Sequence, residues 1–310
     1  MTHDVVGEGL VKALAEEGVT GSLIGPTTVG VSYPGVSDFT IDIGEWRARA
    51  AEIPPAQLPS FIAHVAQGFA RSIRAQAQPS PPWSDIERLL AEESLRMRLY
   101  TEEALSEPPG LRDALLTRTL APGLVETVVV DTPDSIVPLN RSQIGDRPEE
   151  QVFGAALHAS LTKEPHYAKT DAIWGVPITH VGETHRYVGS HIHVLRRHVG
   201  AARYGALVSF PVPEYLIVHE IGDTHIIAAL EAMQELTRTH VEKGDKALTA
   251  QVYWWFPGAY EQLPEPAALA SGQVPDLRPV EVEVNHREKS VTPLTADTGR
   301  LIELWMSDRA

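Results

Sequence analysis

The 310-residue chain contains no cysteine. Disulfides, thiolate nucleophiles, iron–sulfur clusters and zinc sites built on cysteine are therefore excluded. Long hydrophobic runs are also missing, since the longest uncharged apolar stretches fall far short of the roughly 20 residues that a membrane helix needs. The first residues, Met1 to Asp4, lack the basic and apolar regions of a standard secretion signal. We therefore expect a cytoplasmic protein that does not bind membranes.

Basic side chains are scarce relative to acidic ones. The chain has 26 Lys and Arg residues against 41 Asp and Glu, which gives a formal net charge of −15 at pH 7. Because affinity for phosphate backbones comes largely from Lys and Arg, we expect no nucleic-acid partner. The hydrophobic and charged fractions, 43% and 22%, are ordinary for a globular protein.

Common catalytic signatures are absent as well. The sequence has no glycine-rich phosphate loop, no dinucleotide-binding fingerprint, no nucleophile elbow and no paired-histidine zinc motif. No catalytic residue can be assigned on this basis, and we expect no cofactor. The first functional hypothesis is a non-enzymatic, regulatory or binding module whose partner is another protein, with self-association into a homo-oligomer as a further possibility.

Periodicity and turn residues predict an α+β fold of two lobes in which short antiparallel strands pack with helices. The N-terminal lobe, residues 1–76, is expected to contain a helix over 4–17, strands near 22–23, 28–33 and 39–43, and a helix over 58–75. A proline-rich connector over 76–82 follows. The C-terminal lobe, residues 77–310, is expected to be mainly helical over 83–120, and to have a loop over 264–278 and a strand over 280–284.

The C-terminal lobe contains a faint internal repeat. The order strand, turn, strand, helix occurs over residues 124–161 and again over 205–236. One interpretation is a duplicated hairpin–helix unit with a cleft between the copies. The other is coincidence, because a hairpin followed by a helix is common.

The histidines are unevenly distributed. Nine of the 13 lie between His158 and His225, and five of these between His180 and His198. Imidazole is a frequent metal ligand, so the alternative function is a metal-dependent hydrolase that uses this cluster. The candidate ligands are His180, His185, His191 and His193.

The conformation near residue 190 decides which histidines can meet. In a strand, His191 and His193 would share a face, whereas in a helix they would lie about 200° apart. Ser190 is a good N-cap and Gly200 a good stop, so we favour a helix, on which His191 and His198 share a flank. We expect this helix to be exposed to solvent, so that the histidines are surface residues and bind no metal. A metal site is the alternative.

The same stretch is locally basic, and an aromatic run follows it at Tyr253–Phe256. The arginines could receive an anionic ligand or an acidic partner, or they could pair with the protein's own carboxylates. Within the run, Tyr253 and Trp255 should share one face of a strand, with Trp254 on the other. One of these faces is expected to lie in the core. The other must be covered by a helix, a second subunit or a ligand, because large exposed aromatic patches usually mark interfaces. The candidate binding residues are Arg186, His191, Arg196, Arg197, His198, Arg203, Trp254 and Tyr260.

The order of elements over residues 124–161 and 191–218 resembles that of the uncharacterised bacterial YtpQ-like proteins. Those proteins share a strand, an acidic turn, a second strand and a helix, and later a short helix and two strands joined by a proline-containing turn. The turn here reads Pro211-Val212-Pro213-Glu214, where the family tends to carry a Pro-x-Arg-Asp arrangement. The resemblance implies an α/β fold and a cytoplasmic bacterial protein, and it supplies no catalytic residues.

Overall fold

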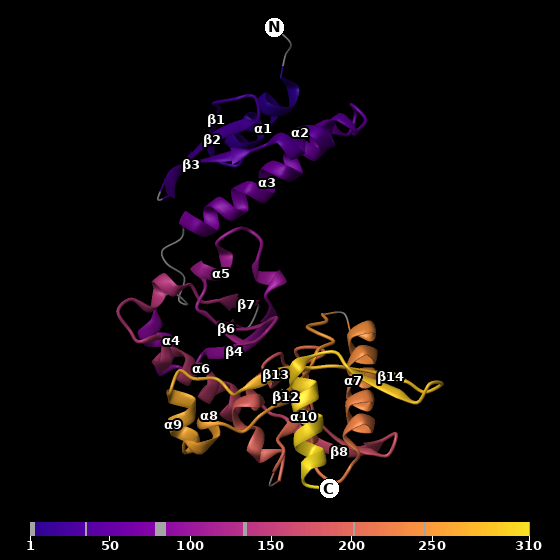
Figure 1. The fold of residues 1–310 in the computed structure, drawn as a ribbon. Helices are drawn as coiled ribbons and strands as arrows, with labels where there is room; N and C mark the ends of the chain where they lie inside the picture. The colour runs from indigo at the N-terminus through magenta and orange to yellow at the C-terminus, as the bar shows by residue number, and fades with distance from the viewer. Residues whose placement is uncertain are drawn as a thin grey trace. The chain divides into compact units, whose positions relative to one another are not determined.

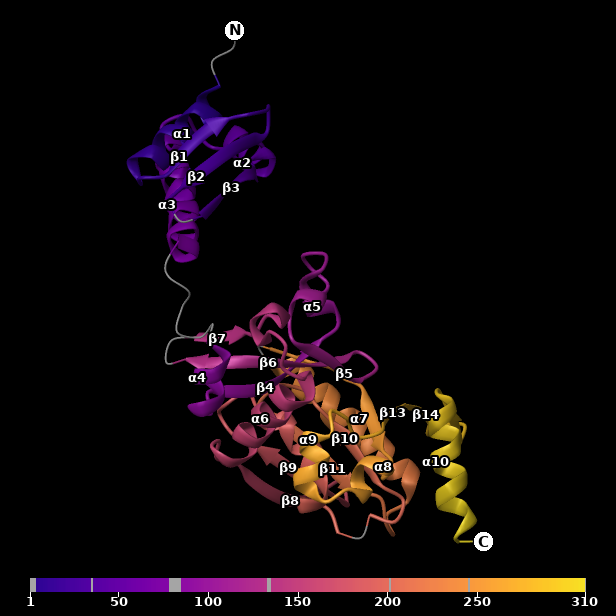
Figure 2. The same ribbon diagram turned by 90° about the vertical axis from the view of Figure 1, so that its left-hand side faces the viewer.

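The protein was analysed as a computed structural model, which describes residues 4–34, 36–77, 85–132, 135–200, 202–244 and 246–309. The chain divides into two compact units, residues 1–82 (unit 1) and 83–310 (unit 2). Figures 1 and 2 show the elements of both. Of the predicted connector, residues 76 and 77 end a helix, and residues 78–82 lie outside the described part of the chain.

Unit 1 is an antiparallel sheet of three strands covered by helices. Its elements agree with those predicted except for the helix α2, which was not predicted. The strands follow the order β1-β2-β3 in the sheet. Leu10 and Leu14 of the first helix pack with Val29 of β2 and Val65 of the long third helix in one core. The elements are α1 (Val5–Glu16), β1 (Thr20–Leu23), β2 (Thr28–Tyr33), β3 (Val36–Asp42), α2 (Gly44–Ala51) and α3 (Leu58–Ala77).

Unit 2 begins with a four-stranded antiparallel sheet, in which β6 lies between β4 and β5 and also pairs with β7. Its strands are β4 (Leu95–Thr101), β5 (Thr117–Ala121), β6 (Leu124–Thr132) and β7 (Ser135–Pro138). The helices of this region are α4 (Ile86–Ala91), η2 (Glu103–Leu105), α5 (Leu111–Ala114), η3 (Arg141–Ile144) and α6 (Glu149–Thr162).

The prediction that residues 83–120 are mainly helical is wrong. The stretch contains only short helices, together with the strands β4 and β5. Leu95, Met97 and Leu99 are buried, while Arg96 and Arg98 between them are partly exposed. This two-residue period is typical of a strand with one buried face.

A six-stranded antiparallel sheet forms the centre of unit 2, in the order β13-β12-β10-β11-β9-β8. Its strands are β8 (Tyr167–Ile173), β9 (Val176–Gly182), β10 (Ala206–Ser209), β11 (Tyr215–Glu220), β12 (Val252–Trp255) and β13 (Leu277–Val280). Among the described strands, β8 lies at the edge of the sheet and pairs only with β9, and it is exposed over nearly its whole length.

The remaining elements of unit 2 correct two predictions. Helix α9 lies within the predicted loop over 264–278, and the predicted strand over 280–284 is divided between β13 and β14. The elements are η4 (Val188–Arg197), α7 (Ile226–Lys243), α8 (Ala259–Gln262), α9 (Glu265–Ala270), β14 (Val282–Asn285), β15 (Ser290–Pro293) and α10 (Ala296–Ser307).

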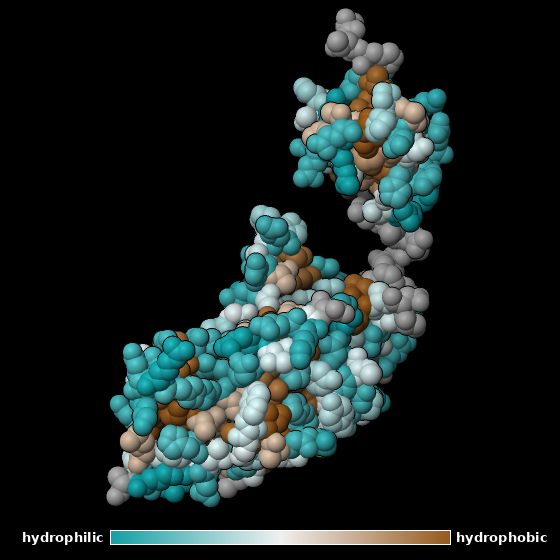
Figure 3. Space-filling view, turned by 90° about the vertical axis from the view of Figure 1, so that its right-hand side faces the viewer, coloured by the Kyte–Doolittle hydropathy of each residue, from teal (hydrophilic) through white to brown (hydrophobic). Residues whose placement is uncertain are grey.

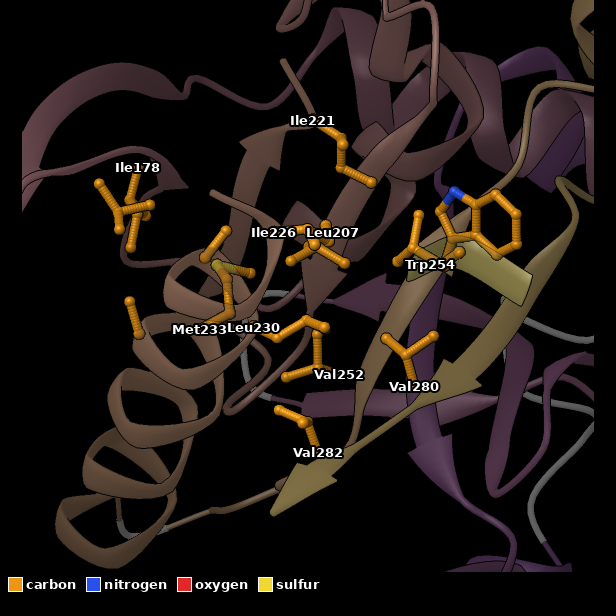
Figure 4. Close-up of a cluster of buried hydrophobic side chains, with 14 of the residues drawn as sticks. Ile178, Leu207, Ile221, Ile226, Leu230, Met233, Val252, Trp254, Val280 and Val282 are labelled. Carbon is orange, nitrogen blue, oxygen red and sulfur yellow. The ribbon is translucent and has the colours of Figure 1, made fainter. Parts of the chain in front are cut away.

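The six-stranded sheet is covered on both faces. Helices α7 and α10 cover one face, where Leu230 and Met233 of α7 pack with Trp254 and Val252 of β12 (Figure 4). On the other face, Trp255 packs with residues of η4 and of the four-stranded sheet. The predicted division of the aromatic run between two faces is therefore confirmed, and the chain itself covers both.

The fold class is α+β, as predicted. Both predicted hairpin–helix units are present, since β6 pairs with β7 before α6, and β10 pairs with β11 before α7. Whether they arose by duplication stays a prediction. Among the described residues, no helix combines the length and the apolar character needed to cross a bilayer.

A glycine at the entry to β10 gives a test of this packing. Gly205 has a φ of +80°, and a Cβ atom there would lie 2.0 Å from the backbone oxygen of Trp255. We expect Gly205→Ala to lower the free energy of unfolding by roughly 2–5 kcal/mol, because backbone strain and overpacking add.

The matched control is Gly123→Ala. Gly123 has a φ of +83° but nothing within 4 Å of the added Cβ, so only the strain of about 1–2 kcal/mol applies. Urea unfolding measures the loss of free energy of unfolding in each variant. Equal losses in Gly205→Ala and Gly123→Ala would contradict the close contact of residue 205 with the backbone oxygen of Trp255.

Candidate functional site

The segment η4 carries four of the predicted site residues, His191, His193, Arg196 and Arg197. Its residues Val188–Arg197 form a 3-10 helix that is interrupted at Val194, where φ is −125°. The preference for a helix is therefore confirmed, although the helix is not an α-helix capped by Ser190. The prediction of solvated histidines is wrong, because His191 and His193 are only 1% and 5% exposed.

Three histidines converge beside η4, and we call them the histidine cluster: His166, His191 and His198. One ring nitrogen from each lies within 4.8 Å of the other two. Nδ1 of His191 and Nε2 of His198 share a hydrogen bond of 3.0 Å. The ring centroids of His166 and His191 are 4.1 Å apart. The predicted meeting of His191 and His198 is confirmed, and His166, from the loop before β8, joins them.

The imidazoles of the histidine cluster are held in their neutral form. Burial, assisted by the neighbouring histidines and Arg197, lowers the pKa of His191 to about 3. Burial, His166 and Arg197 lower the pKa of His198 to about 4. The pKa of His166 is lowered too, mainly by burial. Near neutral pH each of the three neutral rings therefore has one unprotonated nitrogen, which is the state that binds metal ions. Ligation by both Nδ1 of His191 and Nε2 of His198 would move the proton of their hydrogen bond to the other nitrogen of its ring.

The spacing of the histidine cluster can be compared with that of a zinc site. Two imidazole nitrogens on one tetrahedral zinc ion lie about 3.3 Å apart, because each Zn–N bond is about 2.0–2.1 Å. The His191–His198 nitrogen pair, at 3.0 Å, is already near this value. His166 is exposed, so its ring can turn towards the pair without repacking a core. These residues could hold one divalent ion with three ligands and leave a position open.

The predicted ligand set of His180, His185, His191 and His193 is wrong as a set. Only His191 belongs to the histidine cluster. The His180 ring lies next to that of His240 on α7, with the centroids 6.0 Å apart. In His185, Nε2 donates to the Pro165 carbonyl at 2.6 Å and Nδ1 accepts from the backbone of Tyr187, so both nitrogens are in use.

His193 belongs to a second group, the buried network of Arg118, Glu126, His193 and Tyr260. Arg118 Nε donates to Glu126 Oε2 at 2.7 Å, and His193 Nε2 donates to Glu126 Oε1 at 2.6 Å. The hydroxyl of Tyr260 lies 2.9 Å from His193 Nδ1. The side chains of Glu126 and His193 are fully buried. This network joins β5, β6, η4 and α8.

The sequence analysis did not identify Arg118 and Glu126. The available signal was an acidic residue in the otherwise apolar stretch of β6, at a position that shares the inward face of the sheet with Leu124 and Val128. A charged residue at an inward position needs a buried partner of opposite charge.

A small cavity of about 120 Å³ lies beside η4, and two of the predicted binding residues, Arg196 and Tyr260, line it. His193, Trp255 and Glu261 contribute to the same wall. The predicted residues His191 and His198 belong to the histidine cluster instead.

The remaining predicted residues are engaged within the chain. Arg186 lies 3.6 Å from Glu214, Arg197 pairs with Glu265, and Arg203 lies 2.8 Å from Asp308. This favours the interpretation that the arginines neutralise the protein's own carboxylates. Trp254 as a binding residue is wrong, because its ring is only 2% exposed within the core and its indole donates to the Tyr204 carbonyl at 2.7 Å.

The charge of Glu126 should make stability depend on pH. Burial disfavours its ionisation, but Arg118 and His193 outweigh burial and lower its pKa from 4.5 to about 2. A lowered carboxyl pKa stabilises the fold above the unfolded value, and this contribution is lost as pH falls from about 4.5 to 2. We expect it to amount to about 3 kcal/mol.

Urea unfolding of the wild type and of Glu126→Gln between pH 7 and pH 2 measures the effect. The variant should be less stable by about 3–5 kcal/mol at pH 7, because Arg118 is left buried without its partner. The difference in the free energy of unfolding between the two proteins should decrease towards pH 2. A difference that does not change with pH would show that Glu126 is not ionised in the folded protein.

Comparisons with known proteins do not place this chain in a family. No family model, no curated protein and no solved structure matches it. The resemblance to YtpQ-like proteins therefore stays a prediction. The function has to be inferred from the histidine cluster and from the other surfaces of the two units.

Proposed function

We propose that unit 2 binds a divalent transition-metal ion through His166, His191 and His198. The observation that carries this proposal is the convergence of three neutral imidazoles, two of which already have near-ligand spacing. Zinc fits best, because three histidine ligands and an open fourth position are typical of catalytic zinc sites. The cationic Arg197 nearby opposes a metal ion, but its charge is offset by Glu265.

The same geometry supports a metal-dependent hydrolase as the activity. A zinc ion with an open position lowers the pKa of bound water to about 7 and so supplies a nucleophile. His166 is exposed, which leaves that side of the site open to a substrate. Hydrolysis of p-nitrophenyl acetate or p-nitrophenyl phosphate that depends on added zinc tests this activity.

Metal binding is tested on the full-length protein. After loading with Zn²⁺ and desalting, elemental analysis should find one zinc ion per chain. Replacing a residue that hydrogen-bonds a metal ligand typically weakens metal binding roughly 10–100-fold. Because His191→Ala removes a ligand itself, we expect it to weaken zinc binding by more than this.

His286→Ala is the matched control, since this histidine is exposed and, among the residues that the structure describes, bonds only Glu231. It should retain full zinc content. Equal zinc content in His191→Ala and the wild type, or no zinc in the wild type, would contradict the proposal.

Protein binding is the second function that we propose, and a groove on unit 1 favours it. The groove, of about 540 Å³, lies between α1 and α3, with Lys12 and Glu16 among its polar lining residues. Apolar atoms also gather on the face of unit 1 seen in Figure 3. Such a groove suits an amphipathic helix of a partner protein. Apolar residues of the groove include Val5, Ala13, Leu58, Pro59 and Ala63.

The groove is tested by placing charge in it at an exposed position. Val5 is 55% exposed, so Val5→Glu should leave the core intact and abolish partner binding. Val291→Glu, at an exposed apolar residue of unit 2, is the control. Pull-down from the source cells followed by mass spectrometry should recover a protein with the wild type and the control only. Equal recovery with Val5→Glu would rule out the groove.

A cytoplasmic location in a bacterium is part of this proposal. It is supported by the resemblance to YtpQ-like proteins and by the lack of cysteine, which is compatible with a reducing compartment.

A further inference from the structure

Arg98 on β4 has no acidic partner within the described part of the chain, unlike its neighbours in the four-stranded sheet. Arg96 lies 2.6 Å from Glu164, and Arg118 lies 2.7 Å from Glu126. No hydrogen bond or ion pair joins Arg98 to any residue in the described ranges, and its Nε is buried without an acceptor. A buried guanidinium donor without an acceptor is costly, which makes this position unusual.

A second unpaired polar atom lies opposite Arg98. Thr127 of β6 is the cross-strand partner of Arg98, so both side chains project from the same face of the sheet. Thr127 is 0% exposed, and its Oγ1 has no hydrogen-bond partner among the described residues. Two neighbouring strands thus present unsatisfied polar groups on the same face.

The surroundings of Arg98 favour an anion. Its guanidinium lies over the ring of Tyr100, 4.7 Å from the centroid. Both Arg98 and Arg186 are close enough to Tyr100 to oppose, electrostatically, the rise in its pKa that burial causes. Arg186 is paired with Glu214, 3.6 Å away, whereas no ion pair of Arg98 with a described residue offsets its charge. The site therefore combines the Arg98 guanidinium with hydroxyl groups that can donate.

We propose that Arg98, Thr127 and Tyr100 form a binding site for an oxyanion group, a phosphate or a carboxylate. The guanidinium fork pairs with two oxygens of such a group. The Thr127 hydroxyl donates to one of the same oxygens, which satisfies both buried atoms at once. This site lies on the face of the four-stranded sheet opposite Glu126 and is independent of the histidine cluster.

Isothermal titration of the full-length protein with inorganic phosphate, and separately with acetate, tests the site. We expect saturable binding of at least one of the two ions at millimolar concentration, and the preferred ion identifies the ligand group. Arg98→Met keeps the apolar stem over Tyr100 but removes the fork, and should weaken binding at least about tenfold. Thr127→Val should weaken it several-fold, and Arg98→Lys should restore part of the affinity.

Arg112→Met is the matched control, because Arg112 is exposed and already pairs with Glu102. It should bind the ion as the wild type does. Without added ions, the melting temperature of Arg98→Met should stay close to that of the wild type, since the lost contact with the Tyr100 ring is offset by removal of the buried donor that has no acceptor. Unchanged binding in Arg98→Met, no saturable binding in the wild type, or a marked fall in the melting temperature of Arg98→Met would each overturn the proposal.

Discussion

A fully buried carboxylate, that of Glu126, is the constraint around which unit 2 is arranged. Burying an ion without compensation costs several kcal/mol, so its partners must be in place in the folded state. Arg118 comes from β5, His193 from η4 and Tyr260 from α8. The four-stranded sheet, η4 and α8 therefore have to assemble together, and a misplacement of any one of them leaves a buried charge or a polar group unsatisfied.

The segment η4 links this network to the histidine cluster. In an ideal 3-10 helix, two residues seven positions apart would point about 120° away from each other. The interruption at Val194 changes that angle, and His191 and His198 meet at 3.0 Å. His193, between them, is fixed by Glu126. The conformation that satisfies the buried carboxylate is thus the one that brings the two histidines together.

Sequence patterns predicted the elements whose signals are local. The strands of unit 1, its helices α1 and α3, and the shared flank of His191 and His198 follow from periodicity within one segment. Strand β4 was missed because its short alternation lies among helical signals. His166 was missed because its role depends on partners far away in the chain. For Glu126, the acidic residue within an apolar strand was a signal, but it does not identify the distant partners. Trp254 was mistaken for a binding residue since an aromatic run does not reveal that helices α7 and α10 cover it.

The edge position of β8 has a kinetic consequence for the histidine cluster. His166 immediately precedes this strand, which has a single neighbour and little buried surface. Such strands fray at a small fraction of the free energy needed for global unfolding. Fraying would withdraw one of the three proposed ligands while His191 and His198 stay in place. Capture and release of an ion would then be governed by the opening rate of this strand, and exchange would proceed in a protein that is otherwise fully folded.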